Sequence, residues 1–313
     1  MGQDIILKVL NVTKEYKGQT VLNDISLTIH RGEIFGLIGE NGAGKTTLMK
    51  IIAGSSRATE GKIAILGENQ NTQNSRKEMG VIIEHPACYG DMSAIDNLEI
   101  IRLAKKIPDK SLVRETLKIV GLDDVRSKKV NKFSLGMRQR LGLAMALIGS
   151  PQFLILDEPI NGLDPNGIID MRNLIKKLNQ DRGITFLISS HILTELHLVA
   201  TRYGILHEGS LIALHSAQEM EHQCRPSIKI KHDENVEDVV SFLRDKGVTQ
   251  ISLEGNDIII RDTANVPKEL LSMLVKTNYR ITEYFYQQET LEDYFVRLTR
   301  TSLGDQNVQS RAV

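Results

Sequence analysis

Cysteine is scarce in this sequence, with only Cys88 and Cys224 among 313 residues. Two isolated thiols exclude a disulfide framework and a cysteine-based metal site, and they are typical of a reducing compartment. Long apolar runs are also missing. A helix that crosses a bilayer needs roughly 20 mostly apolar residues, and the longest comparable stretch, Leu141 to Gly149, is about half that length. The N-terminal residues contain no basic leader or cleavage site, so the chain by itself is expected to be cytoplasmic.

The sequence also lacks an excess of charge of either sign. Its 39 Lys and Arg residues balance its 39 Asp and Glu residues, and the sequence pI is about 7.1. A neutral chain has no attractive whole-molecule field for a polyanion, so no nucleic acid is expected as a partner. The 41% hydrophobic and 25% charged residues are ordinary for a globular protein and argue against disorder.

What the sequence does contain is an alternation of strand and helix patterns. Two β-type runs, Ile6–Val9 and Ile25–Ile29, precede a buried strand over Glu33–Gly39. A Gly-rich loop follows that strand, and the next residues, Lys45–Ala53, have the pattern of a helix stopped by Gly54. This arrangement is typical of an α/β protein.

The middle of the chain, from about residue 86 to residue 150, has mainly helical spacing. Its last apolar segment, Leu141–Ile148, is apolar nearly all round and predicts a buried helix. After Pro151 two continuous apolar runs, Phe153–Leu156 and Ile184–Ser189, predict strands buried on both faces of a parallel sheet. An amphipathic helix over Ile168–Gln180 separates them.

The C-terminal part has a pattern of its own. Strand, helix, two strands around a Gly255-Asn256 turn, helix, strand and a last helix follow one another, and this βαββαβ order predicts a small ferredoxin-like unit. The sequence therefore predicts a first domain over residues 1–220, an accessory α+β domain over 221–302 and a flexible tail over 303–313. A packing or dimer-bracing role and a regulatory contact both remain open for the accessory domain.

Residues 39–46, GENGAGKT, form the phosphate-binding pattern G-x-x-x-x-G-K-[ST] between a predicted strand and a predicted helix. Glycines let consecutive backbone N–H groups curl around a phosphate, and the helix N-terminus adds partial positive charge. Lys45 would reach the β- and γ-phosphates, and the hydroxyl of Thr46 would ligate Mg²⁺. The sequence therefore predicts a site for a nucleoside triphosphate.

Three further polar residues follow predicted buried strands. Asp157 ends one strand, at the edge where ligands collect in open α/β sheets, and would hold the Mg²⁺ shell. Glu158 comes next and is the natural base for an attacking water. His191 follows the strand ITFLISS, from which it would reach the γ-phosphate or the water. A structural role alone is the alternative for this histidine.

With these motifs in place, residues 4–220 resemble an ABC-transporter ATPase subunit. Phe133–Arg140, FSLGMRQR, resembles the ABC signature, Asn161–Pro165, NGLDP, resembles the D-loop, and Ser189-Ser190-His191 resembles the switch-histidine loop. Tyr16 stands where the family stacks an aromatic ring on adenine. The resemblance implies a P-loop NTPase core with a β subdomain and a helical subdomain.

The resemblance also implies a head-to-tail pair of subunits, with each ATP held between one chain's phosphate loop and the other chain's signature. Ser134 and Gly136 would then complete the partner's site, and Asp164 would lie at the dimer contact. Ser134 is also a suitable N-cap for a helix that starts near Gly136, and a capping role without a ligand is the alternative.

Two positions depart from the family pattern. The signature usually has a glycine where this chain has Leu135, and the loop after the strand Val81–Ile83 usually begins with a Gln that touches Mg²⁺, where this chain has Glu84. An acid there adds negative charge beside the metal. Both departures resemble the bacitracin-resistance and lantibiotic-immunity group of ABC ATPases. The C-terminal unit that ends in Thr290–Phe295 also resembles that group and related drug-exporting subunits.

The function implied is that of the ATP-binding, ATP-hydrolysing subunit of a bacterial ABC exporter that protects against a peptide antibiotic such as bacitracin or a lantibiotic. It would use ATP and Mg²⁺, pair with a second copy of itself, and dock on a separate transmembrane permease at the inner face of the membrane. Catalysis would involve Lys45, Glu158 and His191, and metal binding Thr46, Glu84 and Asp157. The nucleotide would contact Tyr16, Gly39, Asn41, Gly42, Ala43, Gly44, Lys45, Thr46, Thr47, Ser134 and Gly136.

Other functions fit parts of the same pattern. A non-transporting ABC ATPase that acts as a mechanical or signalling module on a membrane partner would carry identical motifs. An ABC protein of translation or DNA repair would have two cassettes or a long coiled-coil insertion, and neither is present in the sequence. A small-molecule kinase would leave the signature unexplained.

Overall fold

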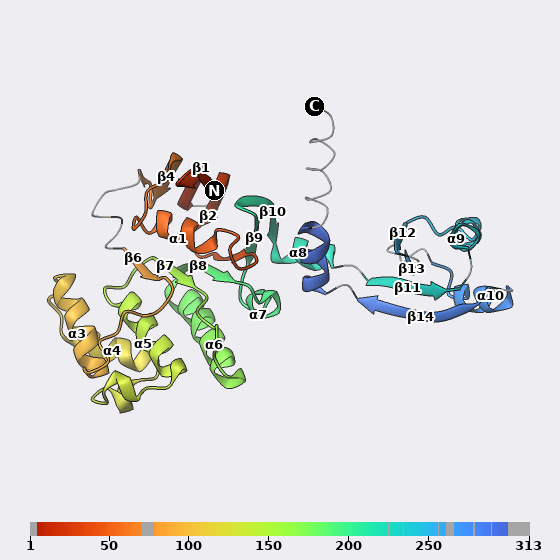
Figure 1. Cartoon of the computed structure of the whole chain (residues 1–313). Coiled ribbons are helices and arrows are strands. Elements are labelled where there is room, and N and C mark those ends of the chain that lie inside the picture. Colours follow the sequence, from red (N-terminus) through yellow and green to blue (C-terminus); the bar gives the residue numbers. More distant parts are fainter. Residues whose placement is uncertain are drawn as a thin grey trace. The chain divides into compact units, whose positions relative to one another are not determined.

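The computed structural model of the chain describes residues 5–69, 75, 78–224, 226–233, 235–255, 257–260, 266–277, 279–288 and 290–299. The chain divides into two compact units, Met1–Ala217 and Gln218–Val313, and each unit is described by itself (Figure 1). The sequence-based domain boundary at residue 220 lies close to this division. The tail expected at 303–313 and Asn256 of the expected turn lie outside the described residues.

The first unit is built around a six-stranded sheet with the order β10-β9-β3-β8-β7-β6. Its strands are, in chain order, β3 (Ile34–Ile38), β6 (Met79–Ile82), β7 (Phe153–Asp157), β8 (Thr185–Ser190), β9 (Arg202–His207) and β10 (Ser210–Ser216). All pairs are parallel except the β9–β10 hairpin. Every residue of β3, β7 and β8 is buried, as the continuous apolar runs predicted.

The order of these strands brings three loops together. Strand β8 lies between β3 and β7, and its Ser189 is opposite both Leu37 of β3 and Asp157 of β7. Because the three strands are parallel, the loops that follow them leave the sheet at the same edge. The phosphate-binding pattern, the acidic pair and the histidine therefore come together, although up to about 150 positions separate them in the sequence.

A second, antiparallel sheet with the order β2-β1-β4-β5 covers the phosphate-loop helix. Its strands are β1 (Ile5–Tyr16), β2 (Gln19–His30), β4 (Glu60–Ile65) and β5 (Glu68–Asn69). The first two strands are longer than the short runs expected, because register shifts interrupt their alternation. A shared apolar core joins the two sheets and helix α1 (Lys45–Ile52) through residues such as Leu22, Leu37 and Leu48.

The predicted helical segment contains α3 (Ala94–Ala104), α4 (Ser111–Ile119), α5 (Leu135–Leu147) and two short 3₁₀ turns, η1 (Asp123–Val125) and η2 (Val130–Lys132). Helix α5 packs on β6, where a Cβ on Gly80 would lie 2.2 Å from the Ala146 carbonyl oxygen. Helix α6 (Pro165–Arg182) and the short α7 (Leu193–His197) complete the unit. None of the helices within the described ranges is long and apolar enough to span a membrane.

Strands β9 and β10 were not predicted from the sequence. The segment contains three basic or histidine positions, Arg202, His207 and His215, and two hairpin residues with positive φ, Glu208 at 44° and Gly209 at 77°. These interrupt the alternation on which strand prediction depends. The omission matters because this hairpin contacts the phosphate loop.

The second unit has an antiparallel sheet with the order β12-β13-β11-β14, which is the ferredoxin-like topology expected. Its elements are α8 (Ala217–Gln223), β11 (Pro226–His232), α9 (Val236–Asp245), β12 (Ile251–Glu254), β13 (Asp257–Ile260), α10 (Leu270–Lys276), β14 (Ile281–Gln288) and a helix over 291–299. Helices α9 and α10 cover one face of the sheet, where Ile230, Leu243 and Leu274 belong to one fully buried cluster.

Candidate nucleotide-binding and hydrolysis site

The phosphate-binding pattern forms a loop between β3 and α1. Gly42 and Gly44 have φ angles of 87° and 105°, which favour glycine. Gly44 is the N-cap of α1, and no side chain accepts a hydrogen bond from the first turn of this helix. The N-terminal amides of α1 are therefore not capped by a side chain, as a phosphate-binding helix requires. Asn41 is exposed on the loop and Thr47 is half-buried, whereas Ala43 is buried.

Backbone groups of the β9–β10 hairpin pack closely against this phosphate loop. A Cβ on Gly39 would lie 2.4 Å from the Leu206 carbonyl oxygen of β9, so this position admits only glycine. The amide of Gly209, in the β9–β10 turn, donates to the Ala43 carbonyl at 3.1 Å, and the Gly209 carbonyl accepts from Asn23 at 2.8 Å. Leu206 and Gly209 are thus parts of the site that sequence reasoning missed.

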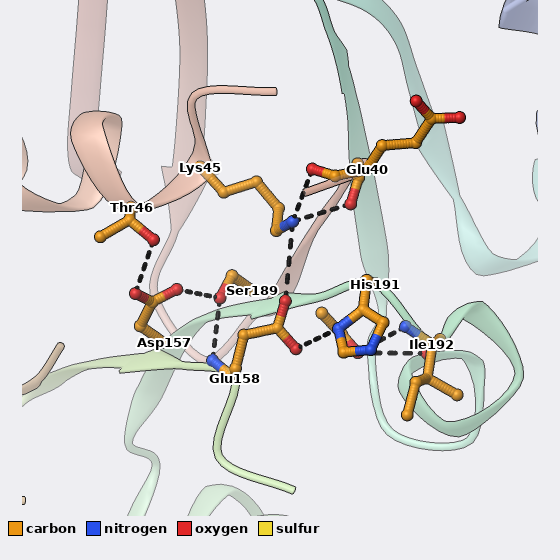
Figure 2. A network of polar contacts seen from close by, with 10 residues as sticks. Glu40, Lys45, Thr46, Asp157, Glu158, Ser189, His191 and Ile192 are labelled. Carbon is orange, nitrogen blue, oxygen red and sulfur yellow. Dashed lines mark hydrogen bonds and ion pairs between the residues drawn. The ribbon is translucent and has the colours of Figure 1, made fainter. Parts of the chain in front are cut away.

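Lys45 is buried at the first position of α1. Its Nζ donates to the carbonyl oxygens of Gly39 at 2.7 Å and Glu40 at 3.1 Å, and it lies 3.6 Å from Oε1 of Glu158 (Figure 2). The ammonium is therefore directed across the loop toward the acidic residues at the end of β7.

Thr46 and Asp157 are brought together from opposite sides of the site. The Thr46 hydroxyl donates to Oδ2 of Asp157 at 2.8 Å, and the Ser189 hydroxyl donates to Oδ1 at 2.5 Å. Asp157 is only 4% exposed, so both of its oxygens are satisfied within the protein. A hydroxyl beside a carboxylate is a donor set that suits Mg²⁺, which usually takes one or two protein oxygens together with substrate phosphates.

Glu158 is held in an unusual backbone conformation, with φ at 49°. Its amide donates to the Ser189 hydroxyl at 2.9 Å, and its Oε2 lies 2.8 Å from Nδ1 of His191 (Figure 2). Ser189 therefore contacts both acidic residues, since it also donates to Asp157. The sequence analysis treated this serine only as part of the histidine motif. Its alignment with Asp157 across two parallel strands is a property of the sheet register.

Glu84 does not join this cluster through any contact of the described residues. Its backbone has φ at 65°, and its Oε1 lies 2.6 Å from Nζ of Lys50. The hydrogen bond with Lys50 lowers the pKa of Glu84, and the same bond raises the pKa of Lys50. Lys50 is one turn beyond Thr46 on α1, so the loop after β6 is tied to the phosphate-loop helix. The expected place of Glu84 beside Thr46 and Asp157 is untested by these contacts.

Tyr16 lies at the end of β1 and is 46% exposed. Its hydroxyl is 3.4 Å from the Ser56 hydroxyl, and Nζ of Lys14 lies 4.5 Å from the ring centroid. The following strand β2 packs against the phosphate loop, because a Cβ on Gly44 would lie 2.7 Å from Leu22. The hairpin thus places an exposed aromatic ring on the side of the unit that carries the loop.

The signature-like segment forms the start of α5. The Ser134 hydroxyl accepts a hydrogen bond from the Met137 amide at 3.2 Å, so Ser134 is the N-cap, and the helix begins at Leu135. Leu135 is 40% exposed and reaches the D-loop-like segment, where a Cβ on Gly162 would lie 3.1 Å from its side chain. Asp164 caps α6 by accepting from Gly167 at 3.1 Å.

The contacts therefore separate the predicted residues into two groups. Lys45, Thr46, Asp157, Glu158 and His191 form one connected cluster around Ser189. Ser134, Gly136 and Asp164 lie at the starts of two other helices, and within the described residues no hydrogen bond or ion pair joins them to that cluster. The first group can bind phosphate, hold a divalent cation and place a carboxylate beside an imidazole.

Comparisons with known proteins agree with this geometry. A family model described as "ABC transporter" matches residues 22–161. The chain is 37% identical over 297 residues to the "Bacitracin transport ATP-binding protein BcrA" of Bacillus licheniformis, covering 94% of this chain and 97% of that protein. It is 42% identical over 207 residues to the "Lantibiotic transport ATP-binding protein SrtF" of Streptococcus pyogenes, covering 66% of this chain and 89% of that protein.

Solved structures resemble the chain over about two thirds of its length. The cbiO1 subunit from Clostridium perfringens, part of the transporter complex cbiONQ, has a TM-score of 0.64 and 27% identity, and it covers 69% of this chain and 90% of that one. A dimeric, post-hydrolysis form of the ATP-binding cassette MJ0796 bound to ADP and Pi has a TM-score of 0.62 and 25% identity over 68% of this chain and 99% of that one.

Proposed function

The chain belongs to the ABC transporter family, as an ATP-binding subunit with ATPase activity, and from this premise we propose that it energises the export of a peptide antibiotic. The observation that carries the proposal is the extent of similarity to the bacitracin transport protein from Bacillus licheniformis. That match covers 94% of the chain, so it includes most of the ferredoxin-like unit as well as the ATPase unit.

Two substrates compete within this proposal. The match to the lantibiotic transport protein covers 66% of the chain, whereas the matches to the bacitracin transport proteins cover 94–95%. The longer match favours bacitracin or a compound of similar chemistry. A module that performs mechanical work or signalling on a membrane partner is the second candidate, and the transport roles for which these relatives are named favour export over it.

ATP would bind to the phosphate loop in the conformation that the structure shows. The uncapped N-terminus of α1 and the amides around Gly42 and Gly44 would surround the phosphates, and Lys45 would exchange its main-chain acceptors for phosphate oxygens. Tyr16 would stack on the adenine. Thr46 and Asp157 would hold Mg²⁺, and the ion would neutralise the charge that develops on the transferred phosphoryl group.

Hydrolysis would depend on Glu158 and His191. Glu158 would accept a proton from a water whose oxygen forms the bond to the γ-phosphorus, while the bond to the bridging oxygen breaks and ADP leaves. Nδ1 of His191 already lies 2.8 Å from Oε2 of Glu158, whereas Lys45 lies near Oε1 of the same carboxylate. From this position His191 would orient the water and the phosphate. Positioning and charge stabilisation would supply most of the rate.

Glu84 would take part only after a rearrangement, because its carboxylate is paired with Lys50. When nucleotide binds, a shift of the loop after β6 would bring this acid toward the metal shell of Thr46 and Asp157. The same loop forms one wall of a groove beside β6, which is lined by apolar side chains, Val81, Ile83, Pro86, Ile101 and Met145 among them, and by the polar side chains of His85 and Lys105. We place the permease contact there, which would keep the chain at the inner face of the membrane.

Two copies would act together. Ser134 and Gly136 lie outside the cluster around Lys45, so they would serve the site of a second copy, with Asp164 at the contact between the copies. The dimeric ATP-binding cassette among the similar structures supports this arrangement. The ferredoxin-like domain, residues 221–302, would be an accessory unit of the same subunit.

The test is export in cells. The chain would be expressed together with a candidate permease in a bacitracin-sensitive host, and both the inhibitory concentration and the accumulation of labelled bacitracin would be measured. Export predicts higher resistance and lower accumulation with the wild-type chain but not with Glu158→Gln. Resistance without any change in accumulation would favour the signalling module, and an inhibitory concentration equal to that of the empty host would remove bacitracin as the substrate.

A further inference from the structure

His191, the histidine of the hydrolysis site, is followed by a short helix whose position depends on contacts with other elements. Helix α7, Leu193–His197, has five residues and no side-chain hydrogen bond at its N-cap. Such a short segment has little intrinsic stability. Its direction, and with it the direction of the loop that carries His191, must be set by contacts with other elements.

Contacts with three other elements hold α7. Nδ1 of His197, its last residue, lies 3.0 Å from the hydroxyl of Tyr203 in β9. On one side Leu196 is buried against β3, where a Cβ on Gly36 would lie 2.7 Å from the leucine side chain. On the other side Glu195 accepts a hydrogen bond from Arg172 of α6, with 3.0 Å between Nη1 and Oε2. The side chains of this ion pair are 20% and 27% exposed, so solvent screens the pair less than it would screen an exposed pair.

The Arg172–Glu195 pair lies beside the reacting groups. A small apolar pocket is lined by both of these residues, by Pro159, which follows Glu158, and by Ser190, which precedes His191. Movement of α7 away from α6 would open this pocket and carry His191 with it. Such a movement would lengthen the distance between His191 and Glu158, which is 2.8 Å while Arg172 and Glu195 are paired.

We infer that Arg172 and Glu195 are positioning residues for hydrolysis, which hold the loop of His191 against Glu158 by clamping α7 to α6. The inference rests on the roles proposed above for Glu158 and His191. Because Asp164 is the N-cap of α6, the pair also joins the histidine loop to the segment expected at the dimer contact.

The inference predicts an effect on turnover without an effect on binding. Lys45, Thr46 and Asp157 are held by β3, α1, β7 and Ser189 and make no contact with the pair. Loss of the clamp would leave ATP affinity within about twofold of wild type and lower kcat about tenfold, since a misplacement on the order of 1 Å can cost up to about 10²-fold.

The experiment measures kcat, KM and the dissociation constant of ATP for the purified full-length chain and its variants. Arg172→Met and Glu195→Gln should each lower kcat about tenfold, and the double variant should be no worse than either. The reversed pair, Arg172→Glu with Glu195→Arg, should recover most of the lost kcat. Arg114→Met is the matched control, because its ion pair with Asp123 joins α4 to η1 within the helical segment, and it should keep the wild-type kcat.

Each outcome either supports or contradicts the positioning role of Arg172 and Glu195. Wild-type kcat in both single variants, or a lost kcat that the reversed pair does not recover, would overturn it. A fall in ATP affinity that matches the fall in kcat would show a general structural role and would also overturn it. His191→Ala separates this inference from the proposed function. Wild-type kcat in His191→Ala would reject the role of the histidine, whereas loss there with wild-type kcat in Arg172→Met would reject the clamp alone.

Discussion

The two units of this chain combine the same kinds of element but place their polar residues differently. In the first unit, the parallel strands β3, β8 and β7 end at one edge, where Lys45, Asp157 and Glu158 lie within one network. In the second unit, neighbouring strands run in opposite directions, and its ion pairs Lys229–Asp257 and Lys231–Glu283 each join adjacent strands. A parallel sheet collects the loops that follow its strands, whereas an antiparallel sheet divides them between two edges.

This difference between the two sheets determines where reactive side chains can lie close together. Residues at strand ends of the first unit are partly or fully buried and hold one another through Ser189, so their geometry is fixed before a ligand arrives. In the second unit, the pair Lys231–Glu283 is 40% and 47% exposed and the pair Lys229–Asp257 is 20% and 26% exposed, and each joins only two adjacent strands. Substitutions in the first unit should therefore change catalysis, and those in the second should change only its own stability.

The largest expected effect is that of Glu158→Gln. The substitution keeps the shape of the side chain but removes the base, so kcat should fall about 10²- to 10⁴-fold, while ATP binding persists. Steady-state hydrolysis and equilibrium binding of ATP measure the two quantities. Glu195→Gln is the matched change at a carboxylate outside the network, for which a much smaller loss is expected. Turnover by Glu158→Gln at the wild-type rate would remove this residue as the base.

The next largest effect is expected from a substitution in the core of the second unit. Leu243→Ala deletes a fully buried side chain of α9, and the unit should lose about 2–5 kcal/mol of unfolding free energy. Denaturant unfolding measures the loss, and Leu253→Ala, at a position that is 51% exposed, should cost much less. The ATPase rate should not change in either variant. If Leu243→Ala also lost ATPase activity, this result would contradict the expected separation of roles, because it would show that the two units depend on one another.

A smaller effect is expected at the hairpin that supports the phosphate loop. Gly209 has φ at 77°, and an added Cβ would lie 2.5 Å from the Val21 carbonyl oxygen. Gly209→Ala should cost about 1–3 kcal/mol from backbone strain alone and should weaken ATP binding, because the Gly209 amide donates to Ala43.

Gly183→Ala provides the control for this strain. Gly183 also has a positive φ, at 64°, but no atom lies within 4 Å of an added Cβ. It should lower stability and leave ATP affinity unchanged. Equal ATP affinity in Gly209→Ala and the wild type would mean that the hairpin is not part of the binding site.

The smallest effect concerns the pair between Lys50 and Glu84. The pKa of Glu84 is lowered, so its contribution to stability is present at neutral pH and is lost as the pH falls through this lowered pKa. The pKa of Lys50 is raised, so its contribution is present at neutral pH and is lost only at alkaline pH above its ordinary pKa. Both side chains are exposed, so screening keeps the effect small.

Unfolding measured against pH tests this pair. The difference in stability between the wild type and Glu84→Gln should shrink as the solution becomes acidic. A difference that stays constant down to acidic pH would show that the pair does not act through the charge of Glu84. Added salt should also reduce the difference.

Most elements of both units could be predicted because their patterns are local. Continuous apolar runs identified β7 and β8, and Ser134 and the following residues identified the start of α5. Strands β9 and β10 were not predicted, and β1 and β2 were predicted too short, because register shifts and positive φ angles interrupt their alternation. The ferredoxin-like order followed from element order alone, since few topologies suit the βαββαβ pattern.

The sequence by itself predicted which residues would carry the chemistry, because phosphate binding needs glycines, a lysine and a hydroxyl at fixed spacing along one loop. The tertiary structure alone decided how those residues are supported. Ser189 contacts both acids through strand register, Gly209 holds the phosphate loop, Lys50 pairs with Glu84, and Arg172 clamps the histidine loop. These partners come from distant segments, and no local spacing encodes a contact that exists only once parallel strands and their helices have packed.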